Sequence, residues 1–95
     1  MMEDKNYISW KDVKKELDIS PEQAMEIQLE QEIIEATIEA RKQCNLTQRE
    51  LSKKSGIKQP VIARIEKYAN SPQINTLIKL FYPMGYTIKV VPFKK

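Results

Sequence analysis

The side chains best suited to recognising another molecule are amides and cations in the middle of this 95-residue sequence. Residues 46–67 read LTQRELSKKSGIKQPVIARIEK. Gln59 could form a paired hydrogen bond with an adenine, and Arg64 could reach either a guanine or a phosphate. The lysines around them could meet phosphates where they lie close enough. The chemistry offered by this segment is therefore hydrogen bonding and ion pairing with a polyanion.

Catalysis is disfavoured by the residue types that are present. The sequence contains no histidine, which is the commonest general base and metal ligand. Its carboxylates are scattered along expected helix faces, without a glycine-rich phosphate loop or a ligand cluster beside them. Cys44, the single cysteine, fits a small core residue better than a reactive thiol. We expect no enzymatic activity, no metal, no cofactor and no small-molecule ligand.

The charge is divided unevenly along the chain. Residues 1–40 hold four lysines and eleven acids, a net of −7, whereas residues 41–95 hold twelve basic residues and two acids, a net of +10. This asymmetry suggests two surfaces with two partners, one of them polyanionic; the alternative is that both charge runs are solvated faces. Because no long apolar run and no signal-peptide pattern occurs, we expect a cytoplasmic protein without a membrane span.

The local signals in the central segment predict two short helices. Thr47 and Glu50 have the spacing of a capping box, which would begin the first helix. Gly56 could end that helix in the left-handed conformation. The second helix would begin after Lys58, with Pro60 in its first turn, where the missing N–H does no harm. The expected unit is a pair of helices joined by a tight turn.

Further helices are expected before this unit. A short helix would begin at Ser9, and a longer one would begin at Ser20, where Pro21 follows the cap, and would run to Gln43. Apolar residues recur along one stripe of the longer helix, and its later half could contribute to a core shared with residues 46–67.

The sequence after the central unit predicts a helix and a strand. Residues 74–85 have a helical apolar pattern that Pro83 and Gly85 would end. The β-branched and aromatic residues after it predict a strand. Because no other strand is expected, pairing with a second copy would satisfy its backbone groups, and the dimer residues would be Tyr86, Ile88 and Val90. The alternative is a dimer that forms through helices.

The predicted fold is therefore mainly α, with five helices, two of which form a helix-turn-helix, and a C-terminal β-strand. Three regions are expected. Residues 1–31 would form an acidic helical extension that binds a partner, residues 32–85 a helix-turn-helix domain, and residues 86–95 the dimerisation strand.

Residues 46–67, and more loosely residues 33–91, resemble the Xre/Cro-type helix-turn-helix repressors. The shared pattern is LTQ-x-EL-x-x-x-x-GI-x-Q-x-x-I-x-x-IE, followed by a loop and P-x-x-x-TL. The stretch YISWKDVKKELDISPEQ, residues 7–23, is similar to that of HigA-type antitoxins. The resemblance implies a lambda-repressor-like arrangement of the five helices. It also implies a repressor of its own operon that binds a ribonuclease toxin. Pro83 departs from the family pattern and is expected to shorten the last helix.

The second helix of the unit would enter the major groove and the flanking residues would contact the DNA backbone. Gln59 is the strongest candidate for a base contact, and Arg64 could contact a base or a phosphate. The expected base-contacting residues are Lys58, Gln59, Pro60, Ala63 and Arg64. The expected backbone-contacting residues are Gln48, Lys53, Lys54, Lys67 and Asn70.

Two further sets of residues have expected roles outside the DNA surface. The resemblance implies an ion pair between Arg41 and Glu66, which would orient helices without contacting DNA. An apolar stripe rimmed by acids suits a basic protein partner such as the toxin. Its residues are Trp10, Val13, Leu17, Met25 and Leu29. The alternative is that the first three of these pack back on the last two as a helical hairpin.

The sequence thus predicts an antitoxin and autorepressor that neutralises a RelE/HigB-like ribonuclease and binds operator DNA as a homodimer. One alternative is a stand-alone phage-type or cellular repressor with no toxin partner. Another is an adaptor protein whose helix-turn-helix has lost DNA binding. Salt-dependent binding to DNA would exclude the adaptor, and a neighbouring gene for a small basic protein would favour the antitoxin.

Overall fold

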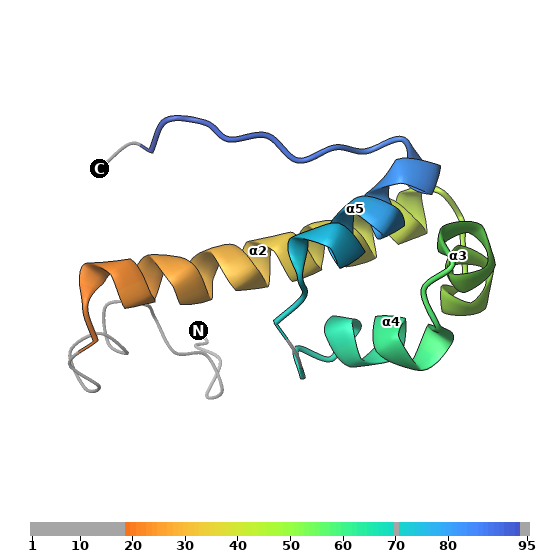
Figure 1. Ribbon diagram of the computed structural model, residues 1–95, viewed down its shortest axis with the longest axis horizontal. Coiled ribbons are helices and arrows are strands. Elements are labelled where there is room, and N and C mark those ends of the chain that lie inside the picture. The colour runs from red at the N-terminus through yellow and green to blue at the C-terminus, as the bar shows by residue number, and fades with distance from the viewer. Residues whose placement is uncertain (1–18, 70, 94–95) are drawn as a thin grey trace, which may run out of the picture. The chain divides into compact units, whose positions relative to one another are not determined.

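The computed structural model describes residues 19–69 and 71–93. Four α-helices and one 3₁₀-helix occur in this part of the chain (Figure 1). They are α2 (Pro21–Gln43), α3 (Gln48–Ser55), α4 (Gln59–Glu66), α5 (Ile74–Phe81) and the 3₁₀-helix η1 (Tyr82–Met84). The chain divides into two compact units, the first ending at Glu30 and the second beginning at Gln31. None of the helices in the described ranges is long and apolar enough to cross a membrane.

Helix α2 begins where the sequence predicts. The backbone N–H of Gln23 donates to Ser20 Oγ at 3.1 Å, and the Ser20 N–H donates to Gln23 Oε1 at 3.0 Å. These reciprocal bonds form a capping box, and Pro21 is the first helical residue. The start of α2 is therefore fixed by contacts within four residues.

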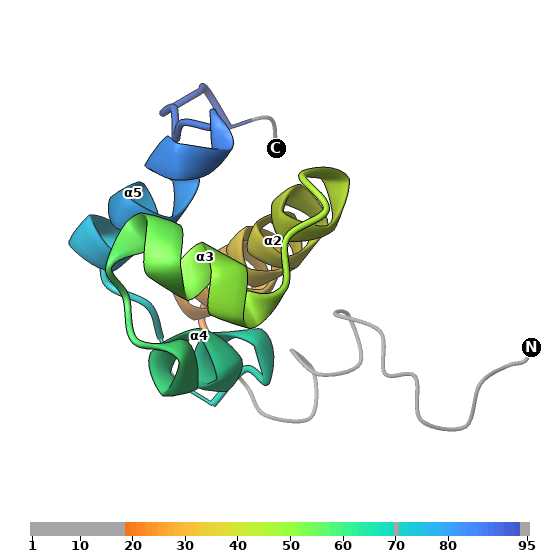
Figure 2. The same cartoon turned by 90° about the vertical axis from the view of Figure 1, so that its right-hand side faces the viewer.

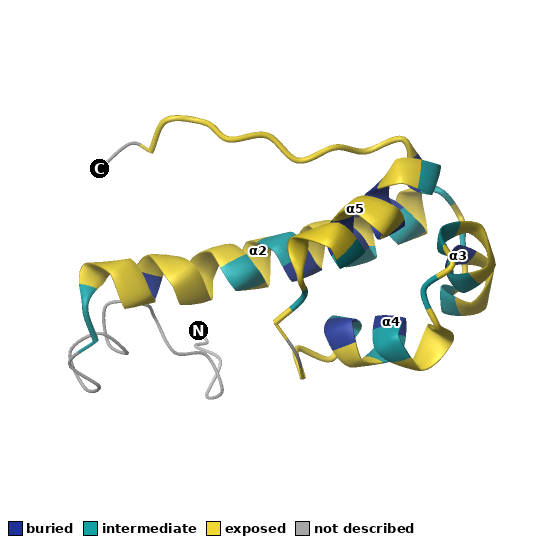
Figure 3. Ribbon diagram, in the orientation of Figure 1, coloured by how far each residue is buried: buried dark blue, intermediate teal, exposed yellow. Residues whose placement is uncertain are grey.

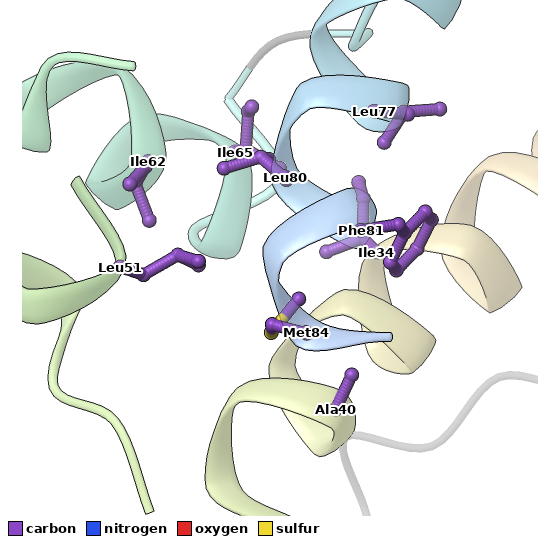
Figure 4. Packing of buried hydrophobic residues seen from close by; sticks show 9 residues of the cluster. All are labelled: Ile34, Ala40, Leu51, Ile62, Ile65, Leu77, Leu80, Phe81 and Met84. Atoms are coloured by element: carbon purple, nitrogen blue, oxygen red, sulfur yellow. The ribbon is translucent and has the colours of Figure 1, made fainter. Parts of the chain in front are cut away.

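The second unit is organised around one apolar core (Figure 4). Every helix of this unit contributes buried side chains to it. They are Ile34 and Ala40 from α2, Leu51 from α3, Ile62 and Ile65 from α4, Leu77, Leu80 and Phe81 from α5, and Met84 from η1. Burying a leucine, isoleucine or phenylalanine contributes about 1.5–3 kcal/mol, so this cluster holds the short helices together. Buried Thr37 is satisfied because its hydroxyl donates to the Ile33 carbonyl at 2.8 Å.

The turn between α3 and α4 confirms the predicted helix pair, whose members pack against each other (Figure 2). Thr47 Oγ1 accepts from the Glu50 N–H at 3.0 Å, and the Thr47 N–H donates to Glu50 Oε1 at 2.8 Å. Gly56 ends α3 with φ +79°, a conformation that a side chain would strain. Lys58 is the N-cap of α4, without a side-chain cap, and Pro60 lies in the first turn.

Two expectations about the fold are wrong. The described residues contain four α-helices and not five; the helix expected at Ser9 falls outside them, and α5 ends at Phe81 because Pro83 follows in η1. The expected strand is also absent, since residues 86–93 form neither helix nor strand. The physical reason is that a strand requires a partner, and no other segment of the described chain offers one.

Candidate nucleic-acid interface

Helix α4 has one buried face and one exposed face, because residues three or four positions apart in a helix lie on the same face. Ile62 and Ile65 are buried in the core. The side chains of Gln59, Pro60 and Arg64 are exposed, so the first turn of the helix is open to solvent (Figure 3). An exposed helix N-terminus also carries the positive end of the helix dipole, which favours an anionic partner.

The remaining candidates for DNA contact lie close to this helix in the sequence. Lys53, Lys54, Lys58 and Lys67 are all exposed, and Ala63 is partly buried. Asn70 falls outside the described residues. The exposed charges of residues 46–67 are therefore mostly positive, because this segment contains only two acids, Glu50 and Glu66.

Gln48 and Gln59 are joined by a direct hydrogen bond that the sequence does not predict. Gln59 Nε2 donates to Gln48 Oε1 at 2.8 Å. Gln48 Nε2 in turn donates to Glu66 Oε1 at 2.9 Å. The first turn of α3, the first turn of α4 and the end of α4 are thus connected by side-chain amides.

Arg41 and Glu66 form a bidentate ion pair at the base of this network. Arg41 Nε lies 2.7 Å from Glu66 Oε2, and Arg41 Nη2 lies 2.9 Å from Glu66 Oε1. Arg41 Nη1 also donates to the Leu46 carbonyl at 2.9 Å. The two side chains are only 15% and 9% exposed. The pair therefore links the end of α2, the start of α3 and the end of α4.

The environment keeps both partners charged. The hydrogen bond with Glu66, which exceeds the opposing effect of burial, raises the pKa of Arg41. Burial acts to raise the pKa of Glu66, but hydrogen bonds from Arg41 and Gln48 and the charges of Arg41 and Lys42 lower it overall. Glu66 is therefore a carboxylate that can only accept hydrogen bonds at neutral pH.

Tyr68 has an unusual backbone conformation directly after α4. Its φ is +61°, in the left-handed region, where glycine and asparagine are favoured. The Tyr68 N–H donates to Ile65 O and the Ala69 N–H donates to Arg64 O, both at 3.0 Å, which is the pattern of a Schellman motif. Burial, followed by the charge of Glu35, raises the pKa of Tyr68. No glycine or asparagine signals this position in the sequence.

The other predicted partner-binding residues belong to other parts of the sequence. Trp10, Val13 and Leu17 lie outside the described residues. Met25 and Leu29 are exposed on α2 within the first unit. Tyr86, Ile88 and Val90 are exposed in the segment after η1.

Two short helices at a tight turn, with an exposed, basic and amide-bearing second helix, define a helix-turn-helix DNA-binding domain. The sequence profile of the helix-turn-helix family matches residues 38–88. The chain belongs to this family and is of the Xre type that the sequence motif indicates. It is a DNA-binding helix-turn-helix regulator.

Similar proteins agree with this assignment. An uncharacterised HTH-type transcriptional regulator of Haemophilus influenzae is 37% identical over 86 residues, which cover 90% of this chain and 87% of the relative. Antitoxin HigA1 of Mycobacterium tuberculosis is 36% identical over 59 residues, which cover 62% of this chain and 40% of the antitoxin. A solved structure described as a toxin–antitoxin module from Streptococcus pneumoniae has a TM-score of 0.69 and 40% identity, and the match covers 92% of this chain and 96% of that one.

Proposed function

We propose that this protein is the antitoxin of a toxin–antitoxin pair and the repressor of its own operon. It acts by binding, with no catalytic step. The observation that carries the proposal is the similarity, at 40% identity over nearly the whole chain, to a chain of a toxin–antitoxin module, together with the exposed face of α4. The partial match to an antitoxin supports the same function.

Operator binding would use the exposed part of the second unit. Gln59 and Arg64 would contact base edges, together with Lys58, Pro60 and Ala63. Lys53, Lys54, Lys67 and Asn70 would contact phosphates. Gln48 donates one Nε2 hydrogen to Glu66, so its second Nε2 hydrogen remains for a phosphate.

A basic ribonuclease of the RelE/HigB type would bind the acidic part of the chain. Residues 21–40 contain six acids and no basic residue. Met25 and Leu29 expose apolar surface among these charges. Complementary charge would guide the encounter, while buried apolar contacts would provide affinity. Trp10, Val13 and Leu17, which lie outside the described residues, are also proposed to contact the toxin.

The operator-binding form would be a homodimer. Tyr86, Ile88 and Val90 are exposed apolar residues in one short segment, and the Val90 side chain is fully exposed. Apolar residues grouped in this way are typical of an interaction site, here with a second copy. A dimer would place two α4 helices about 34 Å apart, which matches successive major grooves of a palindrome.

Co-expression with the neighbouring gene tests the antitoxin function. The toxin gene alone should arrest growth, and this protein should relieve the arrest. Its operator affinity should fall steeply as salt rises, as expected for phosphate contacts. A neighbouring gene product that is neither toxic nor bound would contradict the proposal.

A stand-alone repressor is the second candidate. It is supported by the similarity to the Haemophilus influenzae transcriptional regulator, which covers 90% of this chain. Such a repressor would bind its operator with the same salt dependence but would have no toxin partner. The co-expression experiment therefore separates the two candidates, whereas DNA binding alone does not.

A further inference from the structure

We infer that Glu66 is a positioning residue for base recognition, and that it acts through Gln48 to orient the amide of Gln59 so that it selects adenine over guanine. The inference rests on the proposed operator contact of Gln59. It assigns a specificity role to an ion pair that the sequence indicated to be structural only. Glu66 itself need not touch DNA.

The orientation of Gln48 follows from the chemistry of its partner. The Glu66 carboxylate can only accept hydrogen bonds, and both of its oxygens already accept from Arg41. Gln48 must therefore present its NH₂ group to Glu66, which it does at 2.9 Å. An amide has its donor and its acceptor at opposite ends, so the oxygen of Gln48 points away from the carboxylate.

The orientation of Gln59 follows in the same way. Because Gln48 presents an oxygen, Gln59 must present its NH₂ group to it, which it does at 2.8 Å. The fixed charge of the ion pair thus determines the direction of two successive amides. The low exposure of Arg41 and Glu66 makes this direction costly to reverse, since a wrongly turned amide would place its oxygen against a poorly exposed carboxylate.

The remaining hydrogen-bonding groups of Gln59 match one base. Its Nε2 has two hydrogens, of which one is used by Gln48, and no described residue is seen to donate to its Oε1. One donor and one acceptor therefore remain on an exposed side chain. Adenine offers N7 as an acceptor and N6 as a donor, which this pair satisfies, whereas guanine offers two acceptors, N7 and O6. Recognition of guanine would require both Nε2 hydrogens of Gln59, one of which is donated to Gln48.

Glu66→Gln tests the inference. A glutamine at this position presents one donor and one acceptor, so both directions of the amide chain become possible. The matched control is Glu50→Gln, which removes the only other acid among residues 41–95 and keeps an oxygen to accept from the Thr47 N–H. Both variants lose one negative charge near the DNA surface, so their general gain in DNA affinity should be similar.

The readout is base preference, which a purely structural role would not change. Each full-length protein would first select its preferred site from a library of random duplexes. Its affinity would then be measured for that site with adenine and with guanine at the position that depends on Gln59, and the ratio of the two affinities gives the base preference. The ratio should fall about tenfold in Glu66→Gln and stay unchanged in Glu50→Gln. Gln48→Met, which breaks the amide chain but leaves the ion pair, should lower the ratio similarly. Gln48→Met is the variant to measure if Glu66→Gln does not fold.

A second readout needs no DNA. The side-chain NH₂ resonances of Gln59 should shift in Glu66→Gln and remain in place in Glu50→Gln. Folded Glu66→Gln and Gln48→Met proteins that keep the wild-type preference would overturn this inference and leave operator binding intact. A wild-type protein that selects no sequence would overturn the operator-binding proposal, and this inference with it.

Discussion

Leu29 and Leu51 are the same residue type in opposite surroundings. The Leu29 side chain, in the first unit, is 41% exposed among acidic neighbours, whereas Leu51, in the second unit, is 0% exposed in the core. Met25 and Ile27 are exposed like Leu29. The second unit therefore has an apolar core and also exposes apolar residues such as Tyr86 and Val90. The described part of the first unit buries only Ala24 and leaves its other apolar residues available for contact with another molecule. Stability and partner binding should be separable by mutation.

The largest expected effect is the loss of toxin binding when residues 1–22 are removed. The core of the second unit is built from Ile34 onward, so the shortened chain should fold and bind operator DNA. It should no longer capture the toxin or relieve growth arrest, because most of the proposed toxin surface is absent. Pull-down and growth rescue measure this effect. Full rescue by the shortened chain would contradict our placement of the toxin surface, and loss of folding would support the helical-hairpin alternative.

The second prediction compares two leucines directly. Leu51→Ala should lower the free energy of unfolding by about 2–5 kcal/mol, because it leaves a cavity in a fully buried site. Leu29→Ala should change it by no more than about 0.5 kcal/mol, as is usual for surface substitutions. Urea denaturation gives both values. Equal destabilisation by the two substitutions would show that Leu29 is part of a folding core.

Removing Arg41 should have the next largest effect. Arg41→Ala leaves the poorly exposed Glu66 without its counter-ion and should cost about 3 kcal/mol of stability. Thermal or urea unfolding at neutral pH measures the loss. Arg49, a solvent-exposed residue of α3, supplies the control, since Arg49→Ala should have little effect.

The same ion pair predicts a pH dependence. The pKa of Glu66 is lower in the folded protein than its ordinary value of 4.5, so the folded state holds this proton more weakly than the unfolded state. The contribution of Glu66 is therefore fully present above pH 4.5 and is lost as the pH falls through the folded pKa. Glu66→Gln should lack this part of the acid-induced loss. A parallel pH profile in both proteins would show that folding does not lower the pKa of Glu66.

A contact in this arrangement can be predicted from the sequence when the interacting residues are close together in the sequence. The caps at Ser20 and Thr47 are predictable because their hydrogen bonds join residues three positions apart. The bonds from Gln48 to Gln59 and Glu66 join residues 11 and 18 positions apart, so they depend on how α3 and α4 pack. Local patterns carry no such information. The ion pair was expected only because the sequence resembles a family that has it.

The error in the C-terminal segment has a related cause. Residues 86–91 have the β-branched and aromatic composition of a strand, but composition cannot supply a neighbouring strand. Helices satisfy their backbone groups internally, so α3 and α4 could be predicted from their own residues. A strand depends on pairing elsewhere, and residues 86–93 remain outside any sheet.

Substitutions on the DNA surface should affect binding without affecting stability or toxin capture. Gln59→Ala should weaken operator binding by about 1–3 kcal/mol and relax preference at one base pair. Lys67→Ala should instead weaken binding to operator and random DNA alike and reduce the salt slope by about one unit. Titrations at several salt concentrations distinguish the two. Unchanged operator affinity and preference in Gln59→Ala would show that α4 is not the recognition helix.

The smallest expected effect concerns Tyr68, the residue that ends α4. Left-handed residues follow α2, α3, α4 and η1, and they are Asn45, Gly56, Tyr68 and Gly85. Asparagine and glycine tolerate this conformation, whereas tyrosine in it costs about 1–2 kcal/mol. Some of that cost is recovered in Tyr68→Gly, although glycine makes the unfolded chain more flexible.

Tyr68→Gly should therefore raise the free energy of unfolding by about 0.5–1 kcal/mol, measured by urea denaturation. Ala69→Gly, at the next position, should lower stability slightly, because the flexibility of glycine gives no compensating relief there. A stabilised Tyr68→Gly protein with weaker operator binding would indicate that the strained tyrosine is kept for its place beside the recognition helix. If Tyr68→Gly were destabilised by more than Ala69→Gly, the packing of the tyrosine ring, and not its backbone strain, would determine the stability of this helix end.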